Sequence, residues 1–176
     1  VPRSMFIPAG GISAEPETKL SPVRRRRMVR RCLQAGHAFC RLDLFSDAQS
    51  QFQKAHTLDP NCAEAVYGLG LVEAWEGHDE TAERLLRRAI ALDPQKAAYF
   101  LALGRLLYRC SHLEAAEEAA RRAIALDPAD PSCFDALGWI CLDLGWTEKA
   151  LAAFREALDL SPSLSSALSG MGAALF

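Results

Sequence analysis

The sequence predicts an all-α protein built from repeated pairs of helices, and three observations support this fold class. Four prolines recur at intervals of thirty-four residues, each two residues after a leucine: Pro60, Pro94, Pro128 and Pro162. Glycines recur at the same interval: Gly36, Gly70, Gly104, Gly138 and Gly172. Around them, apolar and small residues follow one another at spacings of three, four and seven, which places them on one face of a helix.

Each unit is expected to contain two helices. The first helix carries the repeated glycine, which lets the paired helices approach closely. In the four units, this first helix is predicted to end near Asp43, Gly77, Ser111 and Gly145, respectively. The second helix ends before the repeated proline, because proline lacks a backbone N–H and clashes with the preceding turn. Ser21-Pro22 and Asp130-Pro131 each have the composition of an N-cap followed by the first helical residue.

These positions resemble the tetratricopeptide repeat, or TPR, family, whose pattern of small, aromatic and proline residues is met at nearly every matched position. The resemblance implies a right-handed superhelical solenoid in which the first helices line a concave groove. It covers residues 29–164 as four units, 29–62, 63–96, 97–130 and 131–164, followed by a partial fifth unit or terminal helix at 165–176.

One position departs from the family pattern. Ala120 stands where the other units have Phe52, Leu86 and Phe154. A small residue there leaves space between the paired helices, so we expect the third unit either to pack more loosely or to be filled by a side chain from a neighbouring unit.

The first 28 residues precede the repeats. Residues 1–4 resemble the remnant of a cleavable tag, and residues 1–20 are expected to form a disordered tail because they are rich in Pro, Gly and Glu. Residues 21–28 are expected to extend the first helix towards the N-terminus. A basic patch runs from this extension into the first unit and comprises Arg24, Arg25, Arg26, Arg27, Arg30 and Arg31. Arginines on every side of a helix lie mostly in water. We interpret them as a solvated cap, with an acidic protein, a lipid headgroup or nuclear localisation as alternatives.

The last helix has an apolar face and no charge, whereas the end of a solenoid needs a polar outer face. Two explanations are open. The sequence was cut from a longer chain, which we favour, or this helix docks on something such as a second copy through Leu168, Met171, Leu175 and Phe176.

Composition narrows the class of protein. A net charge of −2 and a pI of about 6.1 give no general attraction to nucleic acid, and no apolar run reaches the roughly 18 residues of a membrane span. Six cysteines without a CxxC motif favour buried thiols in a reducing compartment, so we expect a cytoplasmic protein.

No motif for catalysis stands out. HExxH, Walker, GxSxG and paired-carboxylate patterns are missing from the sequence. The histidines, which are His37, His56, His78 and His112, are interpreted as surface or groove residues. We therefore predict a protein that is not an enzyme and uses neither a metal nor a cofactor.

The family resemblance implies candidate binding residues on the groove side of each first helix. Large aromatics and arginines dominate binding hot spots. The aromatic candidates are Tyr67, Trp75, Tyr108 and Trp139, and their rings could instead pack between neighbouring first helices. Arg105 and Arg109 are flanked by Asp135 and Asp143 one unit further on, so we expect a partner with apolar anchors and mixed charge. The candidates are Leu33, His37, Arg41, Tyr67, Leu71, Trp75, Leu101, Arg105, Tyr108, Arg109, Asp135, Trp139, Leu142 and Asp143.

One known type of TPR ligand is excluded because this sequence departs from the residues that bind it. TPR domains that bind chaperone C-termini hold two carboxylates with Lys, Arg and Asn. The matching positions here are Leu33, His37, Gly68, Ala98 and Ala102, so this carboxylate-binding site is absent from the sequence. We predict instead an adaptor or scaffold that holds a protein or peptide segment, in its most specific form a secretion-type chaperone. The alternatives are the TPR region of a larger enzyme, such as a glycosyl- or methyltransferase, and a self-assembling scaffold.

Overall fold

The computed structural model describes residues 20–175, which form nine α-helices and no strand. The predicted tail, residues 1–20, therefore lies outside the described residues except for Leu20, and so does Phe176. The helices are α1 (Pro22–Cys40), α2 (Phe45–Leu58), α3 (Ala63–Glu76), α4 (Asp79–Leu92), α5 (Ala97–Arg109), α6 (Leu113–Leu126), α7 (Pro131–Asp143), α8 (Thr147–Leu160) and α9 (Ser165–Leu175).

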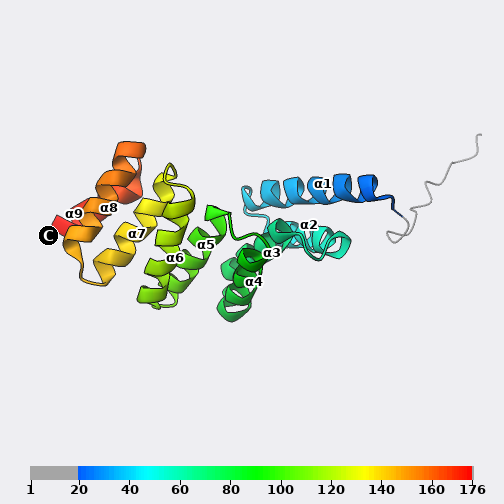
Figure 1. The fold of residues 1–176 in the computed structure, drawn as a ribbon, viewed down its shortest axis with the longest axis horizontal. Coiled ribbons are helices and arrows are strands. Elements are labelled where there is room, and N and C mark those ends of the chain that lie inside the picture. The colour runs from blue at the N-terminus through cyan, green and yellow to red at the C-terminus, as the bar shows by residue number, and fades with distance from the viewer. Residues whose placement is uncertain (1–19, 176) are drawn as a thin grey trace, which may run out of the picture.

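The helices form a solenoid. Each helix packs against the next one in the chain, and the first helices α1, α3, α5, α7 and α9 also contact one another in succession. Figure 1 shows them in chain order along an elongated array, with α9 at the end opposite α1. Helices α3, α5, α7 and α9 begin thirty-four residues apart, so each unit adds one helix pair to the row. No helix among residues 20–175 is long and apolar enough to span a bilayer.

All four predicted breaks have a left-handed backbone. The φ angle is 56° at Asp43, 83° at Gly77, 61° at Ser111 and 76° at Gly145. This conformation ends the first helix of a unit and turns the chain sharply into the second. Glycine adopts it without steric cost, and Asp and Ser keep it in the first and third units.

Local capping confirms the predicted helix ends. The Ser21 hydroxyl accepts a hydrogen bond from the Arg24 amide at 3.4 Å, and Asp130 Oδ1 accepts one from the Ser132 amide at 2.8 Å. The repeated aspartate before the proline has a similar role at the other end of the unit. Its carboxylate accepts from the amide two residues later, at 3.1–3.2 Å, in the case of Asp59, Asp93 and Asp127.

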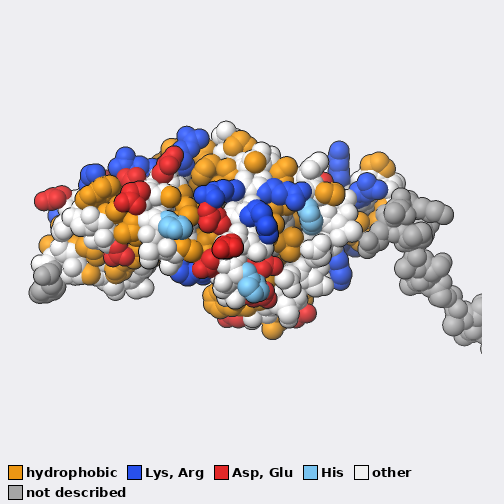
Figure 2. Space-filling model, turned by 90° about the horizontal axis from the view of Figure 1, so that it is seen from below, with side chains coloured by type: hydrophobic (Ala, Val, Ile, Leu, Met, Phe, Trp, Pro, Cys, Tyr) orange, Lys and Arg blue, Asp and Glu red, His pale blue; other side chains and the backbone are white. Residues whose placement is uncertain are grey.

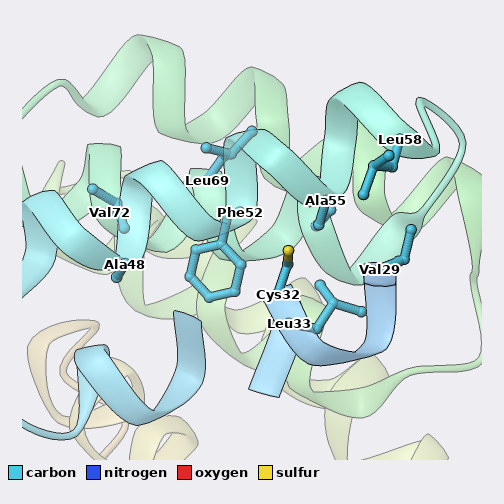
Figure 3. Close-up of a cluster of buried hydrophobic side chains, with 10 residues drawn as sticks. Val29, Cys32, Leu33, Ala48, Phe52, Ala55, Leu58, Leu69 and Val72 are labelled. Carbon is cyan, nitrogen blue, oxygen red and sulfur yellow. The ribbon is translucent and has the colours of Figure 1, made fainter. Parts of the chain in front are cut away.

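Two phenylalanines fill slots lined by glycine. Phe52 of α2 is fully buried between Gly36 of α1 and Gly68 of α3. A Cβ atom on either glycine would lie within 2.6 Å of the ring, so only glycine fits. Figure 3 shows Phe52 near the middle of its cluster, with Leu69 of α3 and Cys32 of α1 beside it. Truncating such a ring costs about 3–5 kcal/mol.

The fourth unit repeats this arrangement. Phe154 of α8 is also fully buried, between Gly138 of α7 and Gly170 of α9, and a Cβ atom on either glycine would clash with the ring. Each phenylalanine therefore joins the two helices of its own unit to the first helix of the next, and it holds both contacts at once.

The middle units solve the same packing problem with smaller side chains. In the third unit, Gly104 approaches the backbone of α6 directly: its Cβ would lie 3.3 Å from the Ala116 carbonyl oxygen and 3.4 Å from the Ala120 nitrogen. Ala120 is fully buried and belongs to one cluster with Ile140 of the next unit. The space left by the small side chain of Ala120 is thus taken up by the close approach of α5 to α6 and by Ile140 of the next unit.

Tyrosines pack the first helices against one another. The rings of Tyr67 and Tyr99 lie 4.7 Å apart between α3 and α5, and Tyr108 of α5 lines the hollow that separates α5 from α7. Burial raises the pKa of all three groups above 10, to about 12 for Tyr99 and Tyr108. At Tyr108 the nearby Asp143 carboxylate raises the pKa further.

The approach of Gly104 to α6 predicts that Gly104→Leu destabilises the fold by roughly 3 kcal/mol, because the neighbouring atoms are backbone and cannot move aside. The matched control is Gly172→Leu, at the equivalent position of α9, where a Cβ meets no atom within 4 Å. Urea unfolding should show a loss of stability for the first variant only. Equal curves for the two variants would contradict this packing.

The tyrosines predict the alkaline behaviour of the fold. Folding raises the pKa values of the tyrosines above 10 and those of five cysteine thiols above 9. Stability should therefore begin to fall as the pH passes 9, and the contribution of the tyrosines should be lost as the pH rises from 10 to about 12. Tyrosinate absorbance in the native protein should therefore rise mainly above pH 11, whereas the urea-unfolded chain should titrate near 10. Coincident native and unfolded titrations would show that the tyrosines are not buried between the helices.

Candidate binding groove

Six of the predicted groove residues surround one hollow between α3 and α5. This central hollow has a volume of about 400 Å³. Its walls are mainly aromatic and aliphatic, and they include two arginines. It is lined by Tyr67, Leu71, Ala74, Trp75, Leu86, Ala98, Leu101, Ala102, Arg105, Leu106 and Arg109.

A second hollow lies between α5 and α7. This distal hollow has a volume of about 180 Å³, and its lining comprises Arg105, Tyr108, Asp135, Ala136, Trp139 and Ile140. Arg105 lines both hollows, so the two adjoin and form one track along successive first helices.

Equivalent positions in the repeat explain why the groove is open in its middle. In the first unit, His37 Nε2 and Glu64 Oε1 of the next unit share a hydrogen bond at 2.9 Å. In the fourth, the Trp139 indole N–H donates to Ser166 of α9 at 3.0 Å. The corresponding pair in the second unit is Leu71 with Ala98, which cannot form such a bridge. The groove is therefore bridged near both ends and unbridged between.

The two groove tryptophans combine packing with exposure. Trp75 stacks on Phe45 of α2 with ring centroids 4.3 Å apart, yet 65% of its surface remains exposed. Trp139 meets Phe154 edge to face at 5.6 Å and is half-buried. One part of each ring therefore packs against a phenylalanine, and another part lines a hollow.

The charges are arranged differently from the sequence prediction. Arg109 was expected beside the aspartates of the next unit, but it forms an ion pair with Asp79, at the start of α4 in the preceding unit. The Cys110 thiol donates to the same carboxylate at 3.5 Å. Arg105 is exposed and forms no ion pair with a carboxylate of residues 20–175. Its charge is consequently available to a ligand.

Asp135 is the residue whose environment sequence reasoning missed. It is only 8% exposed, and its Oδ1 atom has no hydrogen-bond partner among the described residues. The sequence does contain a signal, because the same repeat position holds Leu33, Tyr67 and Leu101 in the other units. A carboxylate at an otherwise apolar repeat position is the pattern that marks Asp135 in the sequence.

The remaining candidates lie away from the two hollows or deeper in the fold. Leu33 is mostly buried, Leu142 is half-buried, and Arg41 and Asp143 are exposed. The basic patch lies exposed along α1. Three of its arginines line a hollow of about 560 Å³ at the start of the solenoid, together with parts of α1, α2 and α3; these are Arg25, Arg26 and Arg30.

The face seen in Figure 2 carries basic, acidic and hydrophobic side chains close together. A surface of this kind lacks the extended field of one sign that attracts highly charged polymers. It suits contacts that combine apolar anchors with individual ion pairs.

The cysteines are free thiols, and burial raises the pKa of five of them: Cys40, Cys62, Cys110, Cys133 and Cys141. Little thiolate is then present at neutral pH, so these groups are poor nucleophiles.

One group of potential metal ligands occurs in the described part of the chain. Atoms of Glu73, Glu76 and His78 lie within 4.8 Å of one another at the turn between α3 and α4. His78 Nδ1 is 2.9 Å from Glu73 Oε2, so hydrogen bonding and charge pairing already account for this cluster.

Comparison with known proteins connects this geometry to a family. The family model for the tetratricopeptide repeat matches residues 33–97, 76–131 and 101–165. Among curated proteins, none matches the sequence.

Three solved structures illustrate the likeness in fold. The protein in "Functional Characterization of Pseudomonas Aeruginosa pilF" has a TM-score of 0.81 and 25% identity, covering 86% of this chain and 69% of that one. YrrB, described as "a TPR protein with an unusual peptide-binding site", has a TM-score of 0.67 and 21% identity, covering 92% and 83%. A Thermobaculum terrenum O-GlcNAc transferase mutant has a TM-score of 0.69 and 25% identity, covering 75% of this chain but 26% of that one.

The repeat positions, the stacked helix pairs and the matched region from residue 33 to 165 agree. The chain belongs to the tetratricopeptide repeat family, whose solenoid is a scaffold for protein interactions.

Proposed function

We propose that the protein is a non-enzymatic adaptor that holds an extended or helical segment of a partner protein in its groove. The observation that carries this proposal is the pair of adjoining hollows, which place apolar and aromatic walls beside the exposed Arg105 and the buried Asp135, whose Oδ1 has no described partner. Apolar anchors supply the binding energy in such a groove, and individual charges fix the register of the segment.

The peptide-binding site named in the description of YrrB supports a peptide as the ligand class. A secretion-type chaperone, which shields an apolar segment of its client, is the more specific form of this proposal. The exposed face of Trp75 and the aliphatic wall formed by Leu71 and Leu101 would suit such a client. The working compartment we propose is the cytoplasm, where a reducing environment keeps six free thiols reduced.

A second candidate is favoured by α9, where Leu168 and Leu175 are 53% and 66% exposed. This apolar surface would be covered if the repeats formed part of a larger enzyme. The O-GlcNAc transferase gives an example, because the match covers 26% of the transferase chain. It would equally be covered by a second copy in a self-assembling scaffold. A monomer in sedimentation experiments at high concentration would count against self-assembly.

Charge reversal at Arg105 tests the groove directly. Arg105 lines both hollows and is exposed without an ion pair to a described carboxylate, so Arg105→Glu should leave the fold intact. Partners captured from native lysate by the intact chain should bind this variant about tenfold more weakly, corresponding to about 1.4 kcal/mol. Quantitative pull-down, with circular dichroism to verify folding, measures the effect.

Arg155→Glu is the matched control for this experiment. Arg155 is exposed on α8, lines neither hollow and undergoes the same change of charge. It should retain the partners. If both variants retain them equally, the binding surface lies elsewhere, for instance on the arginines of α1, and the groove proposal is wrong.

A further inference from the structure

The distal hollow contains a buried carboxylate that the adaptor role alone does not require. Asp135 is more than nine-tenths buried, and its Oδ1 atom has no hydrogen-bond partner among residues 20–175. Burying a carboxylate without a partner is unfavourable, since water no longer solvates the charge. An apolar residue like Leu101, at the equivalent position one unit earlier, would pack there without this cost.

The walls of the hollow suit a cation. Tyr108 and Trp139 contribute aromatic rings, and ring faces attract positively charged groups. A carboxylate only accepts hydrogen bonds, so its complement must be a donor, and a charged donor makes the stronger bond. With a volume of about 180 Å³, the hollow is of the size of one side chain rather than of a folded element.

The charged residues in the lining differ in their surroundings. Arg109 is paired with Asp79 and does not line the distal hollow. Arg105 is exposed to solvent, whereas Asp135 is buried with one oxygen that has no described partner. Asp135 is therefore the charged lining residue whose hydrogen bonding is incomplete when the ligand is absent.

We propose that the distal hollow is a subsite for one basic side chain, a lysine or an arginine, of the partner segment, with Asp135 accepting its hydrogen bond. This inference rests on the proposed groove function and names the chemistry that the groove selects. The aliphatic part of the basic side chain packs between Tyr108 and Trp139, while the apolar anchors of the same segment occupy the central hollow.

The test uses random twelve-residue peptides displayed on phage and selected on the full chain. Three baits are compared: the unchanged protein, Asp135→Asn, and Asp159→Asn. Asparagine keeps the shape of Asp135 and removes its charge. Asp159 is an exposed carboxylate of α8 that lines neither hollow, so it controls for overall charge. The unchanged protein and Asp159→Asn should enrich a basic residue at one fixed position, and Asp135→Asn should not.

A selected peptide then provides the quantitative measurement. Replacing its enriched basic residue by norleucine should weaken binding to the unchanged protein about tenfold or more, and should change binding to Asp135→Asn much less. Thermal unfolding supplies a second readout. Asp135→Asn should melt at the same temperature or higher, because the substitution removes an unpartnered buried charge. A markedly lower melting temperature would show that Asp135 has an internal partner, and would overturn the inference.

The outcomes separate this inference from the proposed function. If groove-dependent peptides are selected, as judged by their loss with Trp75→Ala in the central hollow, but show no enriched basic residue or the same enrichment on Asp135→Asn, the subsite is wrong and the adaptor role stands. If no selected peptide depends on the groove, the proposed function is wrong and this inference falls with it.

Discussion

The solenoid depends on contact between a phenylalanine ring and the bare backbone of two glycines. Phe52 and Phe154 each reach into a slot formed by a glycine of their own unit and a glycine of the next first helix, where no Cβ atom fits. One ring thus sets two helix–helix distances at once. Because each unit touches only its neighbours, these contacts transmit the spacing along the row and define the path of the first helices.

The groove is a consequence of that spacing. At the two ends, the bonds from His37 to Glu64 and from Trp139 to Ser166 connect first helices across the groove. In the second unit Leu71 faces a position held by Ala98, and the smaller Leu86 replaces phenylalanine in the slot. The open stretch of the groove therefore coincides with the units in which the repeat pattern is least strictly kept, as expected where function competes with packing.

Stability and recognition have separate residues in most of this fold, but they meet at Asp135. Its neighbours along the repeat are apolar, and the buried carboxylate has no described partner for one of its oxygens. Burial of such a group is unfavourable in the free protein, and the subsite that we propose would supply the missing donor. Arg109 shows the opposite situation, because its ion pair with Asp79 is satisfied inside the fold and leaves little for a partner.

The sequence by itself determined the helices, their breaks and the core, because these follow from interactions within a few residues. Proline spacing ends each unit, left-handed positions such as Asp43 and Ser111 turn the chain, and Ser21 and Asp130 cap helices as predicted. Only the tertiary structure decided which charges pair and which stay buried alone. Those outcomes depend on the rotation and distance between neighbouring units, which a period of thirty-four residues leaves open. Arg109 therefore meets a carboxylate thirty residues earlier, and Ile140 reaches the cluster around Ala120.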